Sequence, residues 1–249
     1  MTADEAGRLA WIGHSTVLVE LDGARVLTDP MLRRRVAHLR RTGAAVEPGT
    51  LAPVDLILIS HVHWDHLDVP SLVGLGRDTR VVVPRGAGTL LERHGFTHVV
   101  EVGEGERADV NGLAVRATHA AHTARRGPLG VRAASVGYLL GERRRVYFAG
   151  DTDLFGGMSG LANHLHVALL PIAGWGPRLP PGHLDPERAA TALRMLRPRI
   201  AVPIHWGTYR PLVGRGPDDA PGDEFARRAA QLVPDVEVHV LALGAELRF

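Results

Sequence analysis

Six consecutive residues constrain the fold and chemistry of this chain more than any others, and they run His61-Val62-His63-Trp64-Asp65-His66. They directly follow an apolar run, residues 55–60, that is typical of a buried strand. Three imidazoles and a carboxylate at the end of such a strand cost free energy unless a partner compensates their polar groups, and a divalent cation does so. The sequence therefore predicts a metal site at this strand end.

The spacing within the segment suits two metal ions. If the chain leaves the strand extended, His61 and His63 point to the same side, so both can ligate one ion. Asp65 and His66 then lie past the turn, where they can reach a second ion about 3.5–4 Å from the first. The alternative is a polar loop whose histidines are merely surface residues.

Three later segments offer the remaining ligands, and each follows a run that is typical of a strand. Residues 143–149 lead into Asp151, whose two carboxylate oxygens suit it to bridge both ions. Residues 200–204 lead into His205, and residues 113–118 lead into His119 and His122, either of which could complete a coordination shell. Because the ends of separate strands hold a site rigidly, we expect these segments to meet.

These motifs resemble a known group of enzymes. The HVHWDH string, with Asp151 in Gly-Asp-Thr and His205 in Ile-His-Trp-Gly-Thr, resembles the metallo-β-lactamase fold superfamily of mostly dinuclear zinc hydrolases. Residues 11–20 and 27–30 resemble its branch of N-acylphosphatidylethanolamine phospholipase D and ascorbate-6-phosphate lactonase relatives, and residues 182–187 and 205–208 resemble the phospholipase D side. The resemblance covers most of the chain and implies an α/β fold, a four-layer αββα sandwich with the site along one edge.

The resemblance also implies a set of ligands. It places one metal on His61, His63 and His122, a second on Asp65, His66 and His205, and Asp151 between them. The family pattern of a histidine followed shortly by a basic residue falls on His122 and Arg125, and it leaves His119 beside the ligands rather than among them. Two divalent ions are expected; zinc is favoured, and manganese or iron also suit these ligand types.

Mechanism follows from what two cations do to water. Bound water would have its pKa lowered to about 7, so that hydroxide becomes available at neutral pH. Asp65 or Asp151 would orient it for attack on a carbonyl carbon or a phosphorus, and one metal would stabilise the oxyanion. His183 is expected to hydrogen-bond the substrate or assist the leaving group, with helix capping as the alternative. His14 is expected to fix loop geometry behind the ligands.

Other side chains are candidates for the rim of the site. Arg125 and Arg126 are expected to contact a substrate anion. Trp64, Trp175 and Trp206 could wall the substrate pocket or pack in the core. A further cluster, Arg33–Arg35 with Arg40–Arg41, lies in a stretch with helical spacing. Its plainer interpretation is a solvated helix face, and its functional one is a rim that attracts phosphate or an anionic membrane surface.

Composition bounds the class of protein. The 249 residues are 45% hydrophobic, which is ample for a sizeable core, and the expected ligands span residues 61–205, so we expect a single domain over 1–249. The absence of cysteine excludes disulfides and thiolate metal sites. A net charge of only +2 does not by itself indicate nucleic-acid binding. No stretch approaches about 18 apolar residues and no export signal is present, so a cytoplasmic enzyme is expected.

Periodicity predicts where strands and helices fall. Val, Leu and Ile content predicts strands at 14–20, 24–28, 55–60, 80–84, 98–102, 113–118, 134–140, 145–149, 166–171, 200–204 and 236–241. Helices are predicted at 70–75, 88–94, 186–196 and 223–232, with Asp185 as the N-cap before Pro186. Residues 103–111 and 214–222 are predicted to be loops.

Together these observations predict a dinuclear, zinc-dependent hydrolase. Its substrate is expected to be a small molecule or a lipid with an ester, lactone or phosphodiester bond, and peripheral membrane contact is compatible with this. One alternative is a nuclease-type phosphodiesterase on RNA or DNA, although the recognition domains of such nucleases are not evident. Another is a non-catalytic metal-binding protein. The sequence leaves the oligomeric state and the substrate open.

Overall fold

Two seven-stranded sheets form the middle of the protein, for which the computed structural model describes residues 6–128, 130–174, 179–213 and 220–249. The first sheet has the order β19 (Glu246–Arg248), β1 (Arg8–Gly13), β2 (Thr16–Leu21), β3 (Ala24–Thr28), β6 (Leu56–Leu58), β7 (Arg80–Pro84) and β8 (Val99–Val102). The second has the order β18 (Glu237–Val238), β16 (Ile200–Ile204), β15 (Leu165–Pro171), β14 (Arg145–Phe148), β13 (Val136–Leu140), β10 (Leu113–His119) and β9 (Arg107–Val110).

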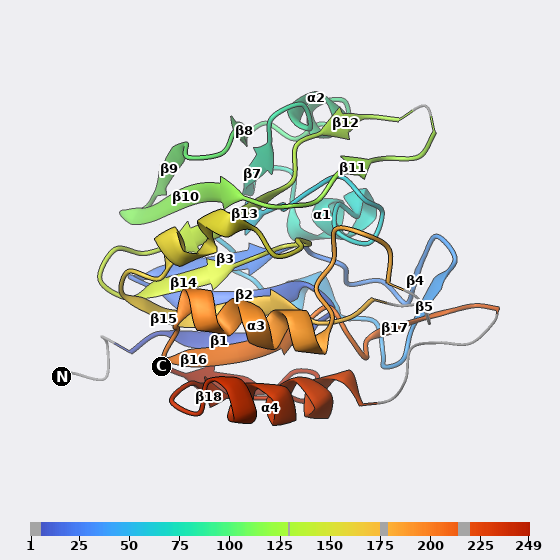
Figure 1. The fold of residues 1–249 in the computed structure, drawn as a ribbon. Coiled ribbons are helices and arrows are strands. Elements are labelled where there is room, and N and C mark those ends of the chain that lie inside the picture. The colour runs from blue at the N-terminus through green and yellow to red at the C-terminus, as the bar shows by residue number, and fades with distance from the viewer. Residues whose placement is uncertain (1–5, 129, 175–178, 214–219) are drawn as a thin grey trace.

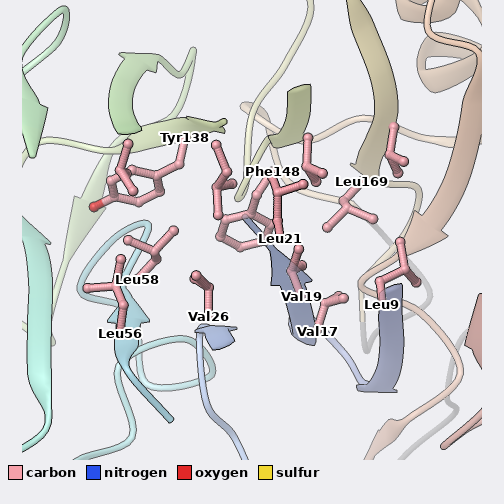
Figure 2. Packing of buried hydrophobic residues seen from close by; sticks show 14 of the residues in the cluster. Leu9, Val17, Val19, Leu21, Val26, Leu56, Leu58, Tyr138, Phe148 and Leu169 are labelled. Atoms are coloured by element: carbon pink, nitrogen blue, oxygen red, sulfur yellow. The ribbon is translucent and has the colours of Figure 1, made fainter. Parts of the chain in front are cut away.

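The two sheets pack face to face, because alternate side chains of their strands point into the space between them. In β2, Val17 and Val19 point into the core between the sheets, whereas Leu18 points to the outer face of the first sheet. From the second sheet, Tyr138 and Phe148 enter the same core (Figure 2). Because the inner side chains of both sheets are large and apolar, their burial stabilises the sandwich.

Helices cover the outer faces because half of each sheet is parallel, and parallel strands need crossover connections. Helices α1 (Val69–Leu75) and α2 (Gly88–Glu92) connect strands of the first sheet and pack on its outer face. Helices α3 (Pro186–Leu196) and α4 (Pro221–Leu232) lie side by side on the second sheet (Figure 1). The predicted four-layer αββα sandwich is therefore confirmed.

Two small sheets and two short 3₁₀ helices complete the described structure. The small sheets pair β11 (Ala124–Arg125) with β12 (Arg132–Ala133), and order β17 (Tyr209–Pro211), β5 (Leu39–Arg41) and β4 (Arg35–Val36). The 3₁₀ helices are η2 (Pro48–Thr50) and η3 (Gly156–Leu161). Among the described residues, no helix has the length and apolar character that crossing a bilayer requires.

Most predicted elements are found, several with the predicted bounds. The strands at 24–28, 80–84 and 200–204 and the helix at 186–196 match β3, β7, β16 and α3. Asp185 is confirmed as the N-cap of α3, since its carboxylate accepts a hydrogen bond from the Arg188 backbone N–H at 2.8 Å. Here local chemistry and tertiary structure agree.

Other predictions were wrong. The strand expected at 14–20 begins only at Thr16, because His14 has a positive φ of 54° that closes a turn after β1, a strand not predicted at all. The loop expected at 103–111 contains β9, which pairs with β10. The helix expected from residue 223 begins at Pro221, two residues inside the predicted loop 214–222, of which 214–219 lie outside the described residues.

The helical spacing around residues 31–39 was also misleading. This stretch forms the β4–β5 hairpin, because Val36 and Leu39 point to one side and pack with Met31 and Tyr209 in a small cluster of their own. Arg41 is buried beneath the hairpin and donates to the carbonyls of Ile12 and Met31. Arg35, Arg40 and Arg41 therefore lie on strands, Arg33 and Arg34 directly precede the first of these strands, and the cluster is not a solvated helix face.

Candidate metal centre

The predicted ligand segments meet at one edge of the sandwich, where parallel strands of both sheets end. The HVHWDH loop follows β6 in the first sheet, and Asp151 and His205 follow β14 and β16 in the second. His122 follows β10. Since carboxyl ends of parallel strands share one edge, the register of the sheets brings these side chains together.

A first group of ring nitrogens comes from His61, His63 and His122. The Nδ1 atom of His63 lies 3.0 Å from Nε2 of His61 and 3.3 Å from Nε2 of His122. Nitrogens that share one tetrahedral zinc ion at about 2.0–2.1 Å lie about 3.3 Å apart. The three donors are therefore spaced as ligands of a single ion would be.

A second group lies beside the first and comes from Asp65, His66 and His205, together with His14. The Nε2 atoms of His66 and His205 are 3.1 Å apart, and the Asp65 Oδ2 atom lies 3.8 Å from each of them. Behind this group, Nε2 of the buried His14 lies 3.2 Å from the same Asp65 oxygen. His14 therefore lies within contact distance of this group, and its Nε2 atom is close enough to count among the possible donors.

Asp151 lies between the two groups. Its Oδ2 atom is 3.7 Å from Nε2 of His61 and 3.2 Å from Nε2 of His66, while its Oδ1 atom is 3.3 Å from Nε2 of His205. Oδ1 is buried and has no hydrogen-bond partner among the described residues. A buried carboxylate oxygen without a donor is costly, so its position suits a bridging metal ligand.

The ring nitrogens that face away from the centre are held in place. Each of four histidines has its Nδ1 atom against an oxygen: His61 against Ser60 Oγ at 2.9 Å, His66 against Asp29 Oδ2 at 2.7 Å, His122 against the Gly182 carbonyl at 2.9 Å, and His205 against the Ala173 carbonyl at 2.6 Å. An Nδ1–H that donates outward fixes the tautomer and leaves the Nε2 lone pair for a metal. The residues present therefore fit divalent cations.

Charge in the cluster supports the same conclusion. Burial lowers the pKa of His122 to about 4 and that of His14 to about 3, so both imidazoles are neutral at neutral pH. Burial also acts to lower the pKa of His66, but the carboxylates of Asp151, Asp65 and Asp29 raise it well above its usual value. Three carboxylates around one imidazole need positive charge, which divalent ions would supply.

Asp29 also contacts the cluster, although no role in the site was predicted for it. Its Oδ1 accepts the Ser60 backbone N–H at 2.7 Å, and its Oδ2 accepts the Ser60 hydroxyl at 2.6 Å and the His66 ring. The parallel pairing of β3 with β6 brings it there. The signal available was a carboxylate directly after the predicted strand at 24–28, one residue before Pro30.

Arg126 holds the metal-binding loop and does not reach toward a substrate anion, contrary to expectation. Its Nη1 donates to the carbonyls of Val62 at 3.1 Å and Leu67 at 2.8 Å, and its guanidinium lies 3.8 Å from the centre of the Trp64 ring. Arg125 points to solvent on β11 and is not among the described residues that line the pocket beside the metal cluster. The expected substrate contact of Arg125 therefore does not fit the structure.

A pocket of about 640 Å³ opens beside the cluster. Its polar floor includes His63, Asp65, Asp151, His183 and His205, and its walls include Trp64, Leu179, Pro180 and the hairpin residues 36–39. His183 places Nε2 at 3.2 Å from Asp151 Oδ2 and anchors Nδ1 on the Pro180 carbonyl at 3.0 Å. It therefore faces both the cluster and the pocket.

Two other predicted residues lie away from the pocket, and a third is outside the described part of the chain. Trp206 does not line this pocket. Its ring stacks on that of Trp11 with 5.4 Å between the ring centroids, and its indole N–H donates to the Pro203 carbonyl. Trp175 lies outside the described residues. His119 is exposed, with Nδ1 2.9 Å from Glu104, so the structure brings His122 to the cluster and leaves His119 out.

Comparison with known proteins agrees with this geometry. The family model described as Beta-lactamase superfamily domain matches residues 24–206. The chain is 33% identical over 244 residues to a UPF0173 metal-dependent hydrolase of Methanopyrus kandleri, covering 95% of this chain and 97% of that protein. It is 30% identical over 240 residues to N-acyl-phosphatidylethanolamine-hydrolyzing phospholipase D 1 of Caenorhabditis elegans, covering 84% and 67% respectively.

A solved structure extends the likeness over nearly the whole chain. Igni18, described as a novel metallo hydrolase from Ignicoccus hospitalis, aligns with a TM-score of 0.75 and 26% identity, covering 98% of both chains. The fold, the convergent donors and these relatives point the same way. The chain therefore belongs to the metallo-β-lactamase superfamily and is one of its metal-dependent hydrolases.

Proposed function

We propose that the chain is a dinuclear, zinc-dependent hydrolase that cleaves an ester, lactone or phosphodiester bond. The observation that carries this proposal is the pair of donor groups on opposite sides of Asp151. His61, His63 and His122 would hold one ion, Asp65, His66 and His205 the other, and Asp151 both. Because these ligands come from both sheets, we also propose that residues 1–249 work as one domain.

The metal ions and the side chains around them would have different roles in hydrolysis. Bound divalent ions would supply Lewis acidity and lower the pKa of water. Asp65 or Asp151 would accept a hydrogen bond from that water and orient the water for attack on a substrate in the pocket. His183 lies on the pocket floor with its ring fixed through Pro180, so it is placed to hydrogen-bond the substrate or to protonate the leaving group.

The pocket supports a substrate with an apolar part. Trp64, Leu179, Pro180, Val36 and Leu39 offer apolar surface, while the polar groups converge on the floor. A pocket with one polar end and apolar walls fits an ester or lactone with a hydrocarbon substituent. The likeness to the phospholipase of Caenorhabditis elegans supports N-acyl phospholipids as a phosphodiester alternative. An RNA or DNA phosphodiester is the further alternative that the test must separate.

A substrate screen with metal analysis tests the proposal. The purified protein would be assayed with lactones, p-nitrophenyl esters, bis-p-nitrophenyl phosphate, N-acyl phospholipids and structured RNA, with zinc measured in parallel. We expect close to two ions per chain, turnover of at least one non-nucleic-acid substrate, and loss of turnover in Asp65→Ala and His66→Ala. Turnover retained in either variant would refute the mechanism, and turnover of RNA alone would favour the nuclease.

A further inference from the structure

The small sheet of β4, β5 and β17 carries a row of arginines. Arg35 pairs with Arg40 across β4 and β5, and Arg40 pairs with Arg210 across β5 and β17, so the three lie in one row across the sheet. The opposite face is buried and carries Val36, Leu39 and the inward-pointing Arg41. Strand alternation therefore fixes the row on the exposed face.

This row is part of a larger cationic surface, which we name the arginine face: Arg33, Arg34, Arg35, Arg40 and Arg210. Four of its members, Arg33–Arg35 and Arg40, surround a surface hollow of about 510 Å³. Arg33 pairs with Asp68, but within the described part of the chain Arg34, Arg35 and Arg40 have no ion pair. Like charges directly opposite each other on two strands are destabilising, so an anionic partner would relieve a cost built into this sheet.

Apolar side chains project next to the arginine face. Leu212 and Val213 directly follow β17 and are 46% and 90% exposed. The Leu212 backbone N–H donates to the His38 carbonyl at 2.9 Å, which ties this segment to the turn between β4 and β5. Trp64, 51% exposed, lines the same pocket as that turn. Cations beside exposed apolar residues form the kind of surface that lies in the headgroup region of a bilayer.

The same hairpin also borders the pocket. Residues 36–39, which include its turn, line the pocket beside the metal cluster, while Arg35 and Arg40 lie on its strands. Figure 1 shows β4, β5 and β17 grouped together at one end of the molecule. The arginine face and one wall of the pocket therefore belong to the same hairpin, on opposite faces of its strands.

We propose that the arginine face, with Leu212 and Val213, docks the protein on an anionic bilayer. The bilayer must carry negative charge to be complementary, because Arg34, Arg35 and Arg40 have no ion pair within the described structure. The exposed apolar pair selects a bilayer over a soluble polyanion, since apolar side chains gain nothing from a hydrated phosphate. The proposal concerns binding alone and does not rest on the proposed reaction.

Vesicle flotation tests the proposal without any assay of turnover. Wild-type protein would be mixed with vesicles of phosphatidylcholine alone or with phosphatidylglycerol added, at low and at raised salt. We expect flotation only with the anionic vesicles, and less of it as salt increases. Each basic residue near an anionic surface contributes about fivefold to partitioning, so the triple variant Arg34→Gln, Arg35→Gln, Arg40→Gln is expected to lose on the order of 100-fold.

Two further variants separate specific docking from general attraction. The pair Leu212→Ser, Val213→Ser should weaken flotation while leaving its salt dependence intact. A matched triple of exposed arginines on other elements, Arg93→Gln, Arg107→Gln and Arg143→Gln, should float like wild type. Circular dichroism would verify that every variant is folded. Wild type that ignores anionic vesicles, or that binds only inorganic polyphosphate or RNA, would overturn the proposal, as would an equal loss in the matched triple.

Discussion

Replacing Asp29 with asparagine removes one of two acceptor oxygens, although all the hydrogen-bond partners of this side chain are donors. Its two oxygens accept from the Ser60 backbone N–H, the Ser60 hydroxyl and the His66 ring at 2.6–2.7 Å. An amide keeps one acceptor oxygen and turns an NH₂ group toward a donor. At least one bond to a charged acceptor is lost, which costs about 1.5–3 kcal/mol. We expect the free energy of unfolding of the metal-free protein to fall by that amount.

The same substitution should weaken metal binding. Partners that orient a ligating histidine typically account for about 10–100-fold in metal affinity, which corresponds to about 1.4–2.8 kcal/mol. Competition with a chromophoric chelator would measure zinc affinity. Asp55→Asn is the matched control, because Asp55 caps the opposite end of β6, where it accepts the Arg25 backbone N–H at 2.8 Å. If Asp29→Asn bound zinc as tightly as Asp55→Asn, the orienting role of Asp29 would be refuted.

Other perturbations have distinct expected outcomes. Removing the metals with EDTA should abolish turnover and lower the melting temperature, and adding zinc should restore both, since a ligand that binds only the folded state stabilises it. If the cluster bound no metal, calorimetry would detect no change in the melting temperature. Asp151→Asn should lower the zinc content found by mass spectrometry, whereas His119→Ala should leave it unchanged, and an equal loss in both would contradict the ligand set. Arg35→Gln should raise the free energy of unfolding by about 0.2–1 kcal/mol by relieving its repulsion with Arg40, and a decrease in chemical denaturation would count against that repulsion. Asp185→Ala should cost about 1 kcal/mol through the lost helix cap without changing the zinc content, which denaturation and metal analysis would check together.

The fold could be predicted from sequence wherever apolar residues follow a single period. The runs of β7 and β16 are apolar on both faces and bounded by charged or polar residues, so their limits agree with the structure. β1 could not be separated from β2 in this way. The turn between them depends on the positive φ of His14, which is fixed by its backbone contacts with Thr208 and His205 far along the chain.

Some residues of the candidate metal site could likewise be predicted from the sequence, and others could not. The meeting of the HVHWDH loop with Asp151 and His205 could be predicted because each segment follows a recognisable strand, and strand ends meet at one edge of a sheet. Asp29 could not, because its contact with His66 depends on the pairing of β3 with β6. Arg126 was misjudged because the β11–β12 pairing turns Arg125 outward and leaves Arg126 pointing at the loop carbonyls. Such partners follow from tertiary register and leave no local signal.

An X-ray structure of the zinc-loaded protein, with anomalous scattering measured at the zinc edge, would show whether the cluster binds two ions. We expect two anomalous peaks per chain, one among His61, His63 and His122 and one among Asp65, His66 and His205, with Asp151 in contact with both. A single peak, or zinc bound away from Asp151, would contradict this expectation.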